Sequence, residues 1–210
     1  MSSLRVTALV LGICLHTASA WSESLSASEP QFRDLYRQLV EINTTLSGGS
    51  CTEAATAMAT RLRSAGIPDS DIHLIVPADW PKQGNLVATY PGTSADAGAL
   101  LLLAHIDVVE ANPEDWERDP FTLIEEDGFF FARGTADDKA MAAIFVDTLT
   151  RMSQSGYRPQ RTIKLALTCG EETPNTFNGV SYLLQHHRDL IDADFALNEG
   201  AWGVICLLYT

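Results

Sequence analysis

The stretch that decides the fold is Ala99-Leu-Leu-Leu-Leu-Ala-His-Ile-Asp-Val-Val109. Its apolar run shows no alternation, which is typical of a strand buried on both faces, such as a central strand of an α/β sheet. Because side chains two residues apart in a strand share a face, His105 and Asp107 lie on the same side. Ligands of open α/β sheets bind at the carboxyl ends of the strands. We therefore expect a functional site where this strand ends.

Three further motifs follow along the chain, and each of them contains acidic residues. They are Arg133-Gly134-x-x-Asp137-x-Lys139, Gly170-Glu171-Glu172 and Asn198-Glu199-Gly200. In this order and at this spacing, the motifs resemble those of the di-zinc aminoacylase/carboxypeptidase family of co-catalytic metallopeptidases. That family includes glutamate carboxypeptidases, aminoacylases, dipeptidases and desuccinylases. A single His-x-Asp arises often by chance, whereas four motifs in register indicate a specific relationship.

The resemblance implies two zinc ions held by four side chains. Zinc in hydrolases takes histidine nitrogen and carboxylate oxygen ligands, and keeps one position open for water. By this resemblance, Asp137 bridges the two ions. His105 and Glu199 complete the ligands of one ion, and Glu172 binds the other. Other divalent metals, such as Co²⁺ or Mn²⁺, could take the place of Zn²⁺.

The same resemblance assigns catalytic roles to two more side chains. Glu171 acts as the general base toward a water activated by the metals, and then as the proton donor to the leaving amine. Asp107 orients the ring of His105 and is not itself a ligand, in the manner of the carboxylates that fix metal-binding imidazoles. Asp138 and Lys139 are supporting residues.

Each of these residues also has an ordinary structural explanation when it is taken alone. A histidine at a strand end is most often a hydrogen-bonded core residue, and Asp137 could simply cap the helix that follows it. Glu171-Glu172 could be a solvated loop pair, and Glu199 before a glycine could belong to a turn. These explanations do not account for the order of all four motifs, so we favour the metal site.

The favoured function is that of a zinc-dependent exopeptidase of the carboxypeptidase or dipeptidase type, cleaving an amide next to a free carboxylate. Its substrate would be a small peptide or an N-acyl amino acid. The alternative within the family is a deacylase of N-acyl amino acids. Rivals from other classes are an inactive fragment and a metal-free binding homologue. The presence of Glu171 counts against the binding homologue, which has no use for a general base.

The resemblance implies a three-layer αβα zinc-exopeptidase-like catalytic domain, and the alternation of strands and helices predicts a mostly parallel sheet covered by helices. Apolar periodicity and capping signals predict helices over residues 29–43, 51–65, 138–152 and 180–187, with Ser28 and Ser50 as the caps of the first two. The strands are expected over residues 72–76, 85–90, 99–104, 162–168 and 195–198. A short hairpin is expected to join 121–124 to 129–131 through Asp127-Gly128.

Met1 to Ala20 has the pattern of a cleavable secretory signal peptide, with a positive start, a short apolar core and an A-x-A site. The apolar core is too short to span a bilayer, which needs ~20 residues. We therefore expect a secreted or periplasmic protein without stable membrane association. The formal net charge is -13, which argues against nucleic acid and anionic lipid as partners.

Three cysteines would remain after cleavage of the leader: Cys51, Cys169 and Cys206. An odd number at wide spacing is no disulfide framework. A bridge between Cys51 and Cys169 is compatible with an oxidising compartment, but nothing in the sequence selects it. Buried free thiols are the favoured interpretation.

The expected organisation is a signal peptide (1–20), a flexible lead-in (21–28) and the N-terminal portion of the catalytic domain (29–205). Residues 206–210 resemble the translated read-through of a sequencing adapter, so we expect the natural chain to continue beyond Ile205. The resemblance implies that a second-metal histidine and a lid domain, which often dimerises, lie in that continuation. We expect the 210-residue chain alone to be poorly stable and nearly inactive, because a half-sheet leaves its edge uncovered.

Overall fold

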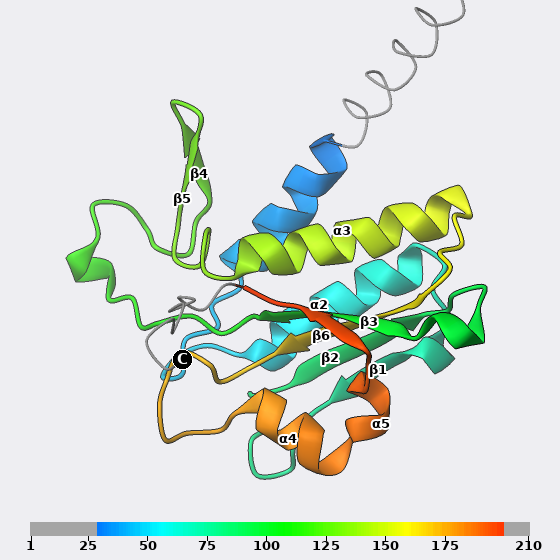
Figure 1. Ribbon diagram of the computed structural model, residues 1–210. Coiled ribbons are helices and arrows are strands. Elements are labelled where there is room, and N and C mark those ends of the chain that lie inside the picture. Colours follow the sequence, from blue (N-terminus) through cyan, green and yellow to red (C-terminus); the bar gives the residue numbers. More distant parts are fainter. Residues whose placement is uncertain (1–28, 200–210) are drawn as a thin grey trace, which may run out of the picture. The chain divides into compact units, whose positions relative to one another are not determined.

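The computed structural model describes residues 29–199, whose helices and strands are drawn in Figure 1. Contacts between residues divide the chain into two units, residues 1–35 and 36–210. The described part of the first unit is the beginning of a helix over residues 29–41, in which Arg33 pairs with Glu29 at 2.8 Å. All other described elements belong to the second unit.

A five-stranded sheet forms the middle of the second unit. The apolar run that became β3 lies between β6 and β7 and is parallel to both. β2 is antiparallel to β6, and β1 is antiparallel to β2. Only β2 therefore runs against the other strands of this sheet, which confirms the expected mostly parallel arrangement. In sheet order, the strands are β1 (Ile72–Ile75), β2 (Asn85–Tyr90), β6 (Thr162–Thr168), β3 (Ala99–His105) and β7 (Phe195–Leu197).

Helices cover both faces of this sheet and complete the expected three layers (Figure 1). On one face, α2 contacts β1 and β2, and α3 contacts β3 and β6. On the other face, α5 contacts β2 and β6 and lies beside α4. An apolar core there joins Val87, Leu101 and Ala166 of the strands to Leu183 and Ile191 of the helices. The helices are α2 (Cys51–Ser64), α3 (Lys139–Ser155), α4 (Gly179–His186) and α5 (Arg188–Ile191).

Side-chain caps and glycine explain where the helices begin and end. Ser50 caps α2, because its Oγ accepts a hydrogen bond from the Glu53 N–H at 3.2 Å, as the sequence predicts. Asn178 caps α4 in the same way through the Ser181 N–H, at 2.9 Å. α3 ends where Gly156 adopts a φ of 67°, a left-handed conformation that favours glycine.

The expected hairpin is present, but its first strand begins later than predicted. β4 (Ile124–Glu126) and β5 (Phe129–Phe131) form a separate two-stranded sheet around the Asp127-Gly128 turn. Asp119 explains the difference, because its carboxylate accepts hydrogen bonds from the Phe121 N–H and the Thr122 Oγ1, both at 2.9 Å. These bonds hold residues 121–122 in a turn and keep them out of the ladder.

The interpretation of the cysteines as buried free thiols is wrong for Cys51 and Cys169, which form a disulfide. Their Cα atoms are 6.1 Å apart, although 118 residues separate them in the sequence. Cys51 is the first residue of α2, and Cys169 follows β6 directly. The fold brings these two element ends together, so no local spacing rule could have selected the pair. Cys206 lies outside the described residues.

The expected signal peptide and lead-in, and the expected helix start at Ser28, also lie outside the described residues. Within residues 29–199, no helix combines the length and apolar character needed to cross a membrane.

Candidate metal centre

His105 is the last residue of β3, and its side chain is almost completely buried, with 2% exposed. Its Nδ1 lies 3.0 Å from the main-chain oxygen of Asp107. Because a carbonyl oxygen can only accept, Nδ1 donates this hydrogen bond. In a neutral ring the lone pair is therefore at Nε2, which is the arrangement of a metal-binding histidine.

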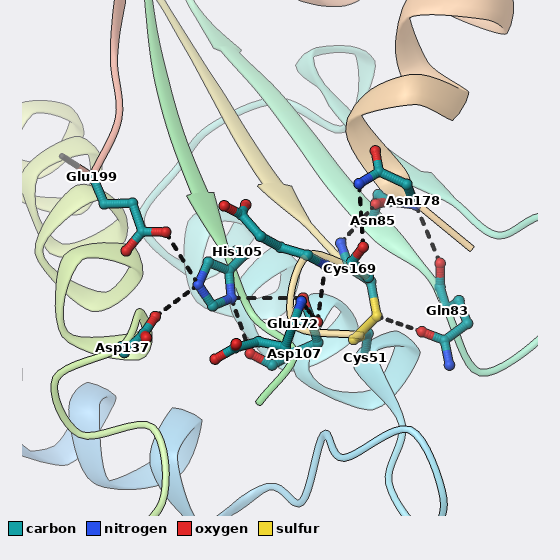
Figure 2. Close-up of polar contacts among 12 residues, drawn as sticks. Cys51, Gln83, Asn85, His105, Asp107, Asp137, Cys169, Glu172, Asn178 and Glu199 are labelled. Carbon is teal, nitrogen blue, oxygen red and sulfur yellow. Dashed lines mark hydrogen bonds and ion pairs between the residues drawn. A yellow bond between two sulfur atoms is a disulfide. The ribbon is translucent and has the colours of Figure 1, made fainter. Parts of the chain in front are cut away.

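Nε2 of His105 faces two carboxylates that come from distant parts of the chain, as Figure 2 shows. It lies 2.9 Å from Oδ1 of Asp137 and 3.4 Å from Oε1 of Glu199. Ligand atoms of these three residues all lie within 4.8 Å of one another. Three acceptors this close repel one another unless a cation lies among them, either a proton on Nε2 or a metal ion. The donor set, imidazole nitrogen plus carboxylate oxygen, is one that Zn²⁺ accepts.

The electrostatics of the site favour positive charge. Burial lowers the pKa of His105, but the hydrogen bond and charge of Asp107, together with the charge of Glu171, outweigh it and raise the pKa to about 10. Burial and nearby carboxylates raise the pKa values of Glu172 and Glu199. Glu172 and Glu199 thus resist ionisation beside the neighbouring carboxylates, and a bound divalent cation would relieve that repulsion.

Asp107 contacts both His105 and the loop that carries Glu171 and Glu172. Its Oδ2 accepts hydrogen bonds from the backbone N–H groups of Glu171 and Glu172, both at 3.0 Å. Its Oδ1 lies 3.6 Å from Nδ1 of His105. Burial raises the pKa of Asp107, but its contacts with His105 and with these backbone N–H groups prevail and lower it. Asp107 therefore stays ionised and fixes both the imidazole and the loop after β6.

Asp137 is placed by the start of α3. The cap position of that helix is taken by Asp138, whose side chain makes no capping hydrogen bond, so the helix-cap explanation of Asp137 does not apply. The side chain of Asp137 is 65% exposed, and its Oδ1 contacts Nε2 of His105. Lys139, the first residue of α3, anchors the helix start. Its side chain is fully buried, and its Nζ donates a hydrogen bond to the main-chain oxygen of Ile42 at 2.7 Å.

The structure thus brings together His105, Asp137 and Glu199, with Asp107 directly behind the histidine. Glu172 is electrostatically coupled to this group but is not one of the three residues whose ligand atoms cluster.

The sequence motifs did not identify Asn85, a fully buried residue whose Oδ1 accepts a hydrogen bond from the N–H of Cys169 at 3.0 Å. No local pattern marks a single asparagine in an otherwise apolar strand.

Comparison with known proteins identifies related sequences. Residues 101–204 match the sequence profile of "Peptidase family M20/M25/M40". Aminoacylase-1 of Mus musculus is 29% identical over 167 residues, which are 79% of this chain and 40% of the mouse protein. A Beta-Ala-Xaa dipeptidase of Lactobacillus delbrueckii subsp. lactis is 32% identical over 115 residues, which are 52% of this chain and 24% of the dipeptidase.

Solved structures show the same fold. Human carnosine dipeptidase 1 superposes with a TM-score of 0.67 at 17% identity, covering 85% of this chain and 40% of that one. An M20 family metallo-carboxypeptidase of Sulfolobus solfataricus gives a TM-score of 0.66 at 20% identity, covering 81% of this chain and 37% of that one.

The fold and the His–carboxylate cluster define an α/β domain with a candidate metal centre. The resemblance seen in the motifs is confirmed, and the chain is related to peptidase family M20/M25/M40. The chain spans about 40% of the length of the mouse aminoacylase that it matches.

Proposed function

We propose that the protein is a metal-dependent hydrolase of amide bonds. One observation carries the proposal: the ring nitrogen Nε2 of buried His105 faces the carboxylates of Asp137 and Glu199 at 2.9 and 3.4 Å. Such a group of acceptors needs a cation. The family relationship, whose members include metallopeptidases and aminoacylases, favours a divalent metal ion over a proton as the working occupant.

The residues present fit a zinc site. His105, Asp137 and Glu199 would hold one ion, and Asp137 and Glu172 would hold a second. When bound, the metals supply Lewis acidity that polarises the scissile carbonyl and lowers the pKa of water. The carboxylate of Glu171 would take a proton from that water and return it to the leaving amine. Asp107 holds the His105 ring and the backbone of Glu171 in place throughout.

The proposed substrates are small peptides and N-acyl amino acids. The relatives support both classes, since one is named an aminoacylase and others are named dipeptidases. An exopeptidase of the carboxypeptidase or dipeptidase type remains our first choice, and an N-acyl-amino-acid deacylase is the alternative. Parallel assays of the full-length protein on dipeptides and on N-acetyl amino acids separate the two.

The decisive test of the proposed chemistry is Glu171→Gln in the full-length protein loaded with Zn²⁺. We expect kcat to fall by roughly 10²–10⁴-fold, the usual contribution of a general base, while the zinc content stays unchanged. Glu114→Gln, which neutralises an exposed carboxylate in a short loop helix, serves as the matched control and should leave kcat unchanged. Equal activity of Glu171→Gln and the control would rule out Glu171 as the base.

We also propose that the protein is exported and that its mature chain begins near Trp21. The leader-like pattern of residues 1–20 supports this proposal. The Cys51–Cys169 disulfide adds support, because disulfides persist mainly in oxidising compartments. Mass spectrometry of the protein recovered from its native host tests the proposal; an intact Met1 or a cytosolic location would contradict it.

A further inference from the structure

The loop over residues 169–178, between β6 and α4, carries both Glu171 and Glu172 and belongs to no helix or strand. Hydrogen bonds secure its two ends. Asp107 holds the N–H groups of both glutamates, and Asn178 donates through Nδ2 to the main-chain oxygen of Gly170 at 3.2 Å. The positions of two proposed functional carboxylates therefore depend on how firmly this loop is anchored.

Cys169, the first residue of this loop, is held from three directions. Its Sγ is joined to Cys51, its N–H donates to Oδ1 of Asn85 at 3.0 Å, and its oxygen accepts from the N–H of Gly179 at 2.7 Å. Of these three contacts of Cys169, the disulfide is the covalent one. Figure 2 shows it beside Asp107 and Glu172. One residue, Gly170, separates Cys169 from Glu171.

The partner cysteine is anchored equally well. Cys51 is 2% exposed and is the first residue of α2. α2 packs against β1 and β2, so it is a rigid support for the loop. The disulfide therefore ties a loop without regular structure to a packed helix.

We propose that the Cys51–Cys169 disulfide is a positioning link of the metal site: it fixes the start of the 169–178 loop and thereby holds Glu171 and Glu172 against the His105 cluster. This inference rests on the proposed metal site. Cleavage of the disulfide lets the loop start move and spreads the two carboxylates over more conformations. Metal affinity falls as a result, although no ligand has been removed.

The test measures Mn²⁺ binding by equilibrium dialysis before and after reduction. Mn²⁺ is the probe because carboxylate and water ligands suit it, whereas freed thiolates prefer softer metals such as zinc. The 210-residue chain carries Cys14→Ser and Cys206→Ser, which leaves Cys51 and Cys169 as its only cysteines. A phosphine reductant cleaves the bridge: phosphine, disulfide and water give phosphine oxide and two thiols.

We expect reduction to weaken Mn²⁺ binding by roughly 10–100-fold, the range for residues that orient metal ligands, and reoxidation to restore it. Circular dichroism verifies that the reduced chain keeps its secondary structure. Ser50→Ala is the matched control, because it removes the cap of α2 one residue from Cys51 and leaves the disulfide intact. Mn²⁺ affinity of this variant should match that of the parent chain.

Each outcome decides a definite point. Unchanged Mn²⁺ affinity after reduction, or an equal loss in Ser50→Ala, would overturn the positioning role and leave the metal site standing. No Mn²⁺ binding by the oxidised chain would overturn the metal site and this inference with it.

A second measurement, hydrogen exchange of the oxidised, metal-free chain, does not require the reduced protein to be prepared. Slow exchange of the Glu171 and Glu172 N–H groups is expected, and rapid exchange would refute the claim that the loop is held.

Discussion

Asp107 shows how one residue can serve two structures at once. Its two oxygens face only N–H donors among the described residues: Oδ2 faces the backbone of Glu171 and Glu172, and Oδ1 faces the ring of His105. Oδ1 makes no hydrogen bond and is buried. A negatively charged group fits this environment, because both oxygens face N–H groups and the charge compensates that of whatever cation His105 binds.

Asp107→Asn should therefore weaken metal binding although its shape is nearly unchanged. The new amide NH₂ must replace one oxygen, and at either position it meets an N–H donor. We expect metal affinity to fall by roughly 10–100-fold, as for other residues that orient ligands, measured by dialysis against Zn²⁺. Asp119→Asn is the control, because its turn includes the Thr122 hydroxyl, which can accept as well as donate. Equal affinities for the two variants would contradict the argument.

At the scale of elements, the sequence was most informative where a pattern is local. The apolar run of β3, the Ser50 cap and the Asp127-Gly128 turn were all predicted from neighbouring residues. The order of the four motifs likewise predicted the cluster of His105, Asp137 and Glu199. Contacts that no motif marks escaped prediction, above all the disulfide, whose partners lie 118 residues apart.

Gly170 is an element-scale requirement of the loop that follows β6. Its φ is 90°, and a Cβ at this position would lie 1.9 Å from the main-chain oxygen of Phe177. Gly128 has a similar φ of 80° but has no atom within 4 Å of such a Cβ. The two positions share the backbone strain and differ in the steric clash.

Gly170→Ala should consequently destabilise the protein more than Gly128→Ala does. Gly128→Ala should cost about 1 kcal/mol, the left-handed penalty of an L-residue, whereas Gly170→Ala should cost at least ~2 kcal/mol more because backbone atoms must move. Urea unfolding measures the difference in the free energy of unfolding. Similar costs for the two variants would mean that the loop yields easily, which would also weaken its proposed role in holding Glu171.

At the scale of the whole second unit, β7 forms one edge of the five-stranded sheet. Within residues 29–199, β7 pairs with β3 alone and exposes large apolar side chains, with Phe195 58% and Leu197 52% exposed. These two residues lie two apart, so their side chains share one face of the sheet. A short strand with an apolar face and unpaired backbone groups is a template for association with another chain.

The 210-residue chain should therefore associate through β7, and Phe195→Lys/Leu197→Lys should suppress that association. Charged side chains at a strand edge oppose strand-to-strand pairing, and they also reduce the apolar patch. Static light scattering over a concentration series should show a smaller apparent mass for the double variant, together with weaker binding of an apolar dye. Phe129→Lys, in the separate β4–β5 hairpin and 67% exposed, controls for the general effect of added charge. If Phe129→Lys reduces scattering as much as the double variant does, surface charge and not the β7 edge governs association.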